Sequence, residues 1–302
     1  MQKFLVRSLF LVLVSVGLYC AVASAEEFAA SYGTLSPEAR AKALAPYTSL
    51  KFPKKGESFP LAILLPGCMG WHPHHTEWET RLLKSKFAVL HVNSFKARGL
   101  TRPRDLQREV CSGRQVTGDE RAGDLASVLG DVWRNSKIRA ENSLIMGWSH
   151  GGWTALDFLV MLENRLTPPN LSRSPSLDVE NFRAALLFYP YCGSAGFNWS
   201  GGLPRGVDGY IFHGSRDVIT SPRECKRRIE RLKKLEETDR WKEGDSVFGL
   251  AKVRVEAAVA KETALPPLPR IPATMRACFP DVETEELPRE EIRGPSSVLY
   301  GN

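Results

Sequence analysis

From Phe59 onward, short runs of apolar residues alternate with stretches in which apolar residues recur at helical spacing. Apolar runs of this length are typical of strands buried on both faces, which occur in parallel sheets covered by helices. The chain therefore predicts an α/β fold with a mostly parallel central sheet flanked by helices. The predicted strands are 61–65, 87–92, 143–146, 184–189 and 209–212, and the predicted helices are 78–84, 120–134, 153–162 and one that begins at Pro222.

The pattern weakens beyond Asp239. A strand over 248–255 fits the sequence, but four prolines between 266 and 272 indicate irregular structure after it. We expect a single domain, divided into a signal peptide at 1–25, an N-terminal extension at 26–58, the core at 59–238 and a poorly patterned segment at 239–302.

The first residues have the pattern of a cleavable secretory signal peptide. Lys3 and Arg7 precede the apolar run Leu9–Leu18, and small residues follow at Ala23 and Ala25. The run is shorter than the ~20 residues that a spanning helix needs. We therefore expect a secreted or periplasmic protein with no stable membrane insertion after the signal is cleaved.

The charge of the chain argues against nucleic acid as a partner. The formal net charge of the 302 residues is +7, and loss of Lys3 and Arg7 with the signal lowers it to about +5. The basic segment Arg223–Lys234 has Ile229 and Leu232 at helical spacing, which indicates the solvated face of an amphipathic helix. We expect no nucleic-acid partner.

The sequence indicates no metal site. His72, His74 and His75 form a tight group, but neither an acidic residue nor a cysteine lies at the spacing that zinc sites use. We interpret the group as a cluster of loop histidines.

Gly147, Ser149 and Gly151 form a G-x-S-x-G pentapeptide between a predicted strand and a predicted helix. Glycines on both sides of such a serine relieve the crowding of a sharp turn, which exposes the hydroxyl at the edge of the sheet. A helix N-cap would also use a serine, but it would not need three glycines in six residues. We therefore predict that Ser149 is a nucleophile.

Acyl transfer to a serine also needs N–H donors for the oxyanion and an acid that orients the base. The backbone N–H of His150 follows the nucleophile, and the turn from Pro66 to Gly70 places a second N–H at Cys68 or Met69. Asp217 follows the predicted strand 209–212 and is the candidate acid.

These motifs together resemble the dienelactone hydrolase family of α/β-hydrolases. The resemblance covers about residues 60 to 230 and rests on LLPGCMG, HVNSFKARG, MGWSHGG, FYPYC and HGSRDVITSPREC in this order. It implies an α/β-hydrolase fold, a Ser149 nucleophile, an Asp217 acid, and oxyanion N–H groups from Cys68 and His150. It also implies small ester or lactone substrates and no cofactor.

The sequence departs from the family at Pro66, where a histidine is common, and in one more serious way. No histidine follows His213, so the histidine that should complete the Ser, Asp, His order is absent. Without a base, a serine is a poor nucleophile.

Three hypotheses account for the missing base. The protein is a degenerate hydrolase that acts as a non-catalytic ligand-binding protein, or a histidine among His72, His74 and His75 acts out of order, or the segment after about residue 239 is not the family's original C-terminus. His150 is an unsuitable base because its side chain is expected to point away along the helix. His213 is expected to be a packed histidine at the end of its strand.

Five cysteines remain after signal cleavage, and an oxidising compartment favours disulfides. Cys192 follows one core strand and Cys225 begins the helix after the next, so both lie at the carboxyl edge of a parallel sheet. Cys68 and Cys111 follow two consecutive core strands in the same way. We predict the bridges Cys192–Cys225 and Cys68–Cys111, which leaves Cys278 free.

Overall fold

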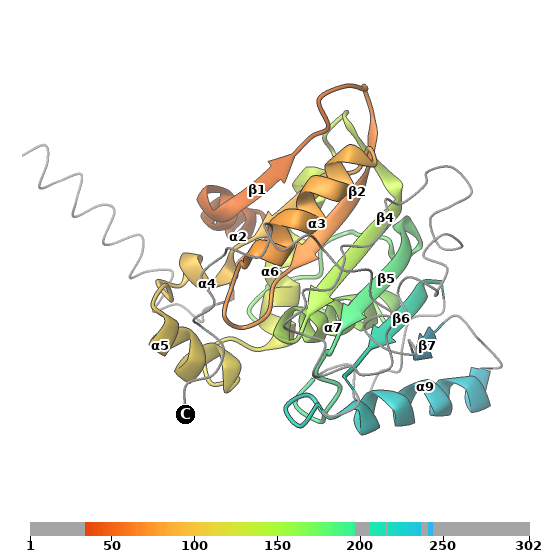
Figure 1. Cartoon of the computed structure of the whole chain (residues 1–302). Coiled ribbons are helices and arrows are strands. Elements are labelled where there is room, and N and C mark those ends of the chain that lie inside the picture. The colour runs from red at the N-terminus through yellow and green to blue at the C-terminus, as the bar shows by residue number, and fades with distance from the viewer. Residues whose placement is uncertain (1–33, 197–205, 215–216, 237–240, 244–302) are drawn as a thin grey trace, which may run out of the picture. The chain divides into compact units, whose positions relative to one another are not determined.

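A mostly parallel sheet forms the centre of the computed structural model, which describes residues 34–196, 206–214, 217–236 and 241–243 (Figure 1). Seven strands are seen within these residues, in the order β1-β3-β2-β4-β5-β6-β7. β1 is antiparallel to β3, and every other pair of neighbours is parallel. The strands are β1 Thr48–Lys51, β2 Phe59–Leu65, β3 Ala88–Val92, β4 Ile138–Trp148, β5 Phe182–Phe188, β6 Asp208–Phe212 and β7 Trp241–Glu243.

Helices connect the strands and cover both faces of the sheet (Figure 1). They are α2 Pro37–Leu44, α3 Pro73–Lys84, α4 Ser94–Ala97, α5 Pro103–Asp105, α6 Gly118–Val132, α7 His150–Glu163 and α9 Pro222–Glu236. Two short 3₁₀ turns, Ala45–Tyr47 and Val179–Asn181, and a π-helical turn, Leu106–Cys111, complete the described elements. This architecture confirms the predicted α/β class.

The two faces of the sheet carry different side chains. Alternate strand residues such as Ile63, Ile145 and Leu187 are buried in one core with α6, α7 and residues Cys225 and Ile229 of α9. On the other face the rings of Trp148, Phe188 and Phe212 stack in a row, and Trp78 of α3 packs against the first two. Strands buried on both sides explain why the apolar runs in the sequence are continuous.

The structure differs from the sequence predictions at several elements. The segment predicted as an N-terminal extension contributes α2 and the edge strand β1, which is too short and too polar to be recognised from its pattern. β7 was also not predicted, and the possible strand 248–255, the signal peptide and Cys278 lie outside the described residues. All described residues belong to one of the two units into which the chain divides, Met1–Pro266.

The prediction that His72, His74 and His75 lie in a loop is wrong. Helix α3 begins at Pro73, a position where proline suits a helix, so His74 and His75 lie in its first turn and His72 is the N-cap residue. The three histidines were predicted to lie in a loop because no zinc-ligand spacing was found, and that absence says nothing about the start of a helix.

Both predicted disulfides are present. Cys68 is bonded to Cys111 with 5.0 Å between their Cα atoms, and Cys192 is bonded to Cys225 with 5.2 Å between theirs. Each bridge joins segments that meet at the carboxyl edge of the sheet, as the parallel arrangement requires. No helix within the described residues is long and apolar enough to cross a membrane.

Candidate active site

Ser149 lies at a sharp turn between β4 and α7 and has an unusual backbone conformation. Its φ of 51° and ψ of −117° fall outside the regions that residues other than glycine prefer. Strain of this kind persists only where the surrounding structure enforces it, and it is concentrated at functional sites. The geometry is that of a nucleophile elbow.

Two glycines make this turn possible. A Cβ atom on Gly151 would lie 1.8 Å from the carbonyl oxygen of Leu65, and one on Gly147 would lie 2.5 Å from the carbonyl oxygen of Gly151. The start of α7 is therefore pressed against the end of β2 and the end of β4. No other residue type fits at either position, which explains the pentapeptide physically.

Backbone hydrogen bonds fix the serine at the edge of the sheet. The N–H of Ser149 donates to the carbonyl of Phe188 over 2.8 Å, and its carbonyl accepts from Trp153 N–H over 3.0 Å. The residue is half-buried. Its hydroxyl makes no hydrogen bond to any of the described residues.

The turn after β2 runs beside Ser149. A Cβ atom on Gly67 would lie 3.4 Å from the Cβ atom of Ser149. Within the described part of the chain, no hydrogen bond uses the backbone N–H of Cys68 or that of His150. His150 is the first residue of α7, where N–H groups have no partner inside the helix and favour negative charge. Both predicted oxyanion donors are thus unoccupied.

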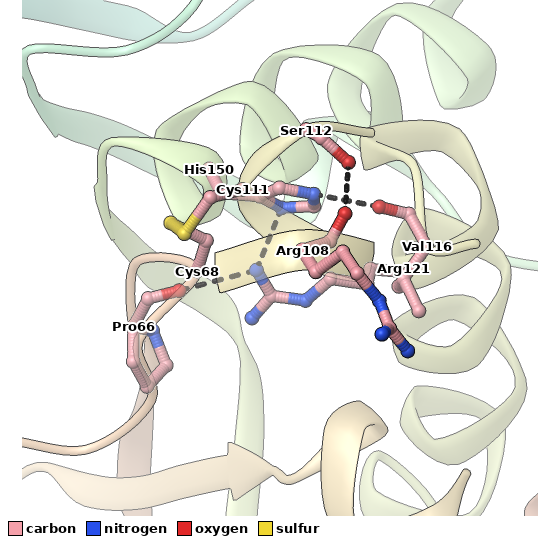
Figure 2. The surroundings of a disulfide bond; sticks show 8 residues. All are labelled: Pro66, Cys68, Arg108, Cys111, Ser112, Val116, Arg121 and His150. Atoms are coloured by element: carbon pink, nitrogen blue, oxygen red, sulfur yellow. Dashed lines mark hydrogen bonds between the residues drawn. A yellow bond between two sulfur atoms is a disulfide. The ribbon is translucent and has the colours of Figure 1, made fainter. Parts of the chain in front are cut away.

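The side chain of His150 has a different role from its backbone. Its Nε2 lies 2.9 Å from the carbonyl oxygen of Val116, and its Nδ1 lies 3.0 Å from Nη1 of Arg121 (Figure 2). Burial, followed by the nearby charge of Arg121, lowers the pKa of His150 to about 3. The imidazole of His150 is neutral, buried and hydrogen-bonded at both ring nitrogens, which supports the expectation that His150 is not the base.

Asp217 follows β6, two strands away from the elbow. Its carboxylate accepts hydrogen bonds from the N–H groups of Ile219 and Thr220, each over 2.9 Å, and from the Thr220 hydroxyl over 2.6 Å. Burial alone would raise the pKa of Asp217, but these hydrogen bonds outweigh it and lower the pKa. The carboxylate is therefore ionised and fixed in a turn, and no described histidine is hydrogen-bonded to it.

His213 ends β6 and is buried, with 7% of its surface exposed. Neither ring nitrogen has a hydrogen-bond partner among the described residues. Burial lowers its pKa, although the charge of Asp217 acts in the opposite direction. This environment fits the predicted packed histidine.

His74 and His75 pack against the ring of Trp148, the residue before Ser149, with centroid distances of 5.8 and 4.7 Å. His75 is fully buried, and its Nδ1 accepts from the His72 N–H over 2.8 Å. Burial, reinforced by the neighbouring histidines, lowers the pKa of His74 to about 4 and that of His75 to about 3. Both are therefore weak bases.

All six histidines of the sequence lie within the described residues, the remaining one being His91, whose ring packs 4.6 Å from that of Trp71. None of the six is hydrogen-bonded to a carboxylate of the residues that the structure describes. The described residues also contain no group of three or more His, Cys, Asp or Glu side chains that could hold a metal ion.

Arg121 of α6 was not predicted from the sequence. It is 2% exposed, and its Nη1 donates to the carbonyl of Pro66 over 3.1 Å as well as to His150. The signal was present in the sequence, because Arg121 precedes the buried Leu125 and Val128 by one and two turns of the helix. A charged residue in an apolar stripe indicates a buried charge with a specific partner.

Comparison with known proteins gives structural neighbours only. No family model matches the sequence, and no curated protein matches it. Solved structures that resemble the chain include a putative dienelactone hydrolase from Klebsiella pneumoniae subsp. pneumoniae, with 15% identity, a TM-score of 0.47 and coverage of 65% of this chain and 83% of that one.

A dienelactone hydrolase-like promiscuous phosphotriesterase from metagenomic libraries has 14% identity, a TM-score of 0.45 and coverage of 65% and 80%. A lipase/esterase from Lactobacillus plantarum has 11% identity, a TM-score of 0.47 and coverage of 70% and 94%. The neighbours thus include dienelactone hydrolase-like proteins and other α/β-hydrolases, the group that the sequence motifs resemble. At these identities and TM-scores, the likeness by itself assigns no activity.

Proposed function

We propose that this protein is an exported serine hydrolase of the dienelactone hydrolase type that acts on small esters or lactones through an acyl-enzyme on Ser149. The observation that carries the proposal is the strained elbow at Ser149, held by Gly147 and Gly151 at the carboxyl edge of the sheet. A structural N-cap serine has no need of that strain.

The chemistry follows from the groups around the elbow. The Ser149 oxygen attacks the carbonyl carbon of the ester, and the negative charge that forms on the carbonyl oxygen is stabilised by the N–H groups of Cys68 and His150. The C–O bond to the alcohol then breaks, the alcohol takes the proton that the serine released, and water hydrolyses the acyl-enzyme. Asp217 is the acid that would orient the base for these proton transfers.

A second function is favoured by a specific observation. Among the described residues, no carboxylate is hydrogen-bonded to a histidine, and five of the six histidines have a lowered pKa. A protein with this site and no efficient base would bind an ester or a related ligand and turn it over slowly or not at all.

Export is part of the proposal. The signal-peptide pattern at residues 1–25 directs the chain out of the cytoplasm, and two disulfides suit an oxidising compartment. The predicted location is the periplasm or the extracellular medium.

The rate of reaction with a fluorophosphonate probe separates the two functions, because only an activated serine is labelled quickly. We expect the wild-type protein to be labelled and Ser149→Ala to remain unlabelled. Hydrolysis of p-nitrophenyl acetate should fall by ~10³-fold or more in the variant if a working triad is present, and only slightly if the base is absent. Unchanged turnover in Ser149→Ala would refute the assignment of the nucleophile.

A further inference from the structure

We infer that Arg121 is a positioning residue of the oxyanion hole, which joins the two chain segments that carry the N–H donors. The inference rests on the proposed function. One amino group of the guanidinium, Nη1, donates to the Pro66 carbonyl over 3.1 Å and to the Nδ1 of His150 over 3.0 Å (Figure 2). Pro66 lies two residues before Cys68, and His150 carries the other donor.

The hydrogen bonds that join Arg121, His150 and Val116 can run in only one direction. A carbonyl oxygen can only accept, so the Nε2 of His150, 2.9 Å from the Val116 oxygen, carries the hydrogen. The Nδ1 is then a lone-pair acceptor and receives a hydrogen from Arg121. A protonated His150 would direct an N–H at the guanidinium, which the lowered pKa of His150 avoids. Arg121 therefore holds the ring of His150 in one tautomer and one orientation.

Arg121 is placed where its charge is costly. It is 2% exposed, its carbon Cζ lies 4.5 Å from the centroid of the Phe95 ring, and its Nε has no hydrogen-bond partner among the described residues. The charge of the buried Asp124 acts on Arg121, but the ion pairs of this carboxylate are with Arg40 and Arg98. A buried guanidinium normally needs a paired carboxylate, whereas the hydrogen bonds of Arg121 go to the turn and the elbow.

A second link stabilises the same turn. The Cys68–Cys111 disulfide ties it to the segment that leads to Val116, the acceptor of the His150 ring (Figure 2). The turn is thus held from one side by a covalent bond and from the other by Arg121. Since an oxyanion hole works only when its donors are fixed before the reaction, loss of Arg121 should slow the chemical step rather than weaken binding of the substrate.

The test compares Arg121→Gln and Arg121→Lys with Arg40→Gln. Arg40 is a buried arginine, 4% exposed, whose guanidinium donates to Asp124 and to the Asn170 carbonyl. We measure kcat and KM for p-nitrophenyl acetate per folded protein, the inhibition constant of phenylboronic acid, which forms a tetrahedral adduct with an active serine, and the midpoint of thermal unfolding.

Removal of one oxyanion donor costs ~10²–10³-fold in kcat, so a residue that acts through the donors should cost about 10-fold to 100-fold. We expect Arg121→Gln to show this fall in kcat, with KM changed less than about threefold. The affinity for the boronic acid should fall by about the same factor as kcat. Arg121→Lys keeps the charge but not both hydrogen bonds, and should fall between Gln and wild type. Arg40→Gln should lose thermal stability and keep its kcat.

The outcomes separate the inference from the proposed function. If wild type is active and both Arg121 variants lose only thermal stability, as Arg40→Gln does, the inference is overturned and the proposed function stands. If wild type neither turns over the ester nor reacts with a fluorophosphonate, the proposed function fails, and the inference fails with it. If Arg121→Gln does not fold, the kcat and boronic-acid affinity of Arg121→Lys decide in the same way.

Discussion

At the scale of single residues, desolvation decides which groups can do chemistry. His74 and His75 lie close in space to Trp148, the residue before the predicted nucleophile, which is the proximity that the out-of-order base hypothesis requires. Their burial, however, lowers their pKa to about 4 and about 3, and a base with so low a pKa draws a proton weakly at neutral pH. Proximity to the elbow is therefore not sufficient for the role of base.

Alanine substitutions test this conclusion. We expect His72→Ala, His74→Ala and His75→Ala each to react with a fluorophosphonate within about threefold of the wild-type rate, measured per folded molecule. A base and its nucleophile act as a unit, so loss of the true base should cost nearly as much as loss of the serine. A variant that is labelled as poorly as Ser149→Ala would identify its histidine as the base.

At the scale of elements, the disulfides connect the loops that follow parallel strands. Cys68–Cys111 closes a separation of 43 residues and Cys192–Cys225 one of 33. In the chain-entropy model, bridges of this length each stabilise the folded state by about 4 kcal/mol. Because the two bridges are expected to stabilise the fold by similar amounts, each is a control for the other. Of the four cysteines, only Cys68 carries a predicted oxyanion donor.

We expect Cys68→Ser/Cys111→Ser and Cys192→Ser/Cys225→Ser to lose comparable amounts of unfolding free energy in urea. Only the first pair should also slow fluorophosphonate labelling of the folded protein, because it releases the turn beside Ser149. Equal labelling rates in the two double variants would show that the bridge does not help to hold the turn. Peptide mapping without reduction should first find Cys192 linked to Cys225.

At the scale of the whole molecule, buried neutral histidines make stability depend on pH. Burial, the largest cause in each case, lowers the pKa of His75 and His150 to about 3 and that of His91 to about 4, from an ordinary 6.5. The unfolded chain takes up protons on these rings below pH 6.5, whereas the folded chain does not. Their contribution to stability is therefore fully present above pH 6.5 and is lost as the pH falls towards 4 and then 3.

The free energy of unfolding should accordingly be lower at pH 5 than at pH 7.5 by at least about 2 kcal/mol, since each unit of pH below 6.5 costs ~1.4 kcal/mol per histidine. Urea unfolding of the oxidised protein at both pH values measures it. His91→Asn should reduce the difference, because one proton fewer is taken up on unfolding. A stability that does not change between the two values would show that these histidines are not held neutral.

The sequence by itself determined the order of the central elements and the position of the elbow. Continuous apolar runs predict strands buried on both faces, and G-x-S-x-G has a local meaning because Gly147 and Gly151 relieve a steric conflict within one turn. The disulfide pairs also followed from the sequence, since parallel strands place their carboxyl ends at one edge. Local sterics and periodicity are properties of short segments, and a sequence displays them directly.

Only the tertiary structure decided the edge strands and the surroundings of the buried polar side chains. The edge strand β1 and the short β7 have little pattern of their own and exist because a neighbouring strand offers hydrogen bonds. The environment of each histidine and the contacts of Arg121 depend on segments far apart in the chain, such as the 55 residues between Arg121 and Pro66. Burial and hydrogen bonding set the pKa of a side chain, and both are defined only once distant segments have packed together.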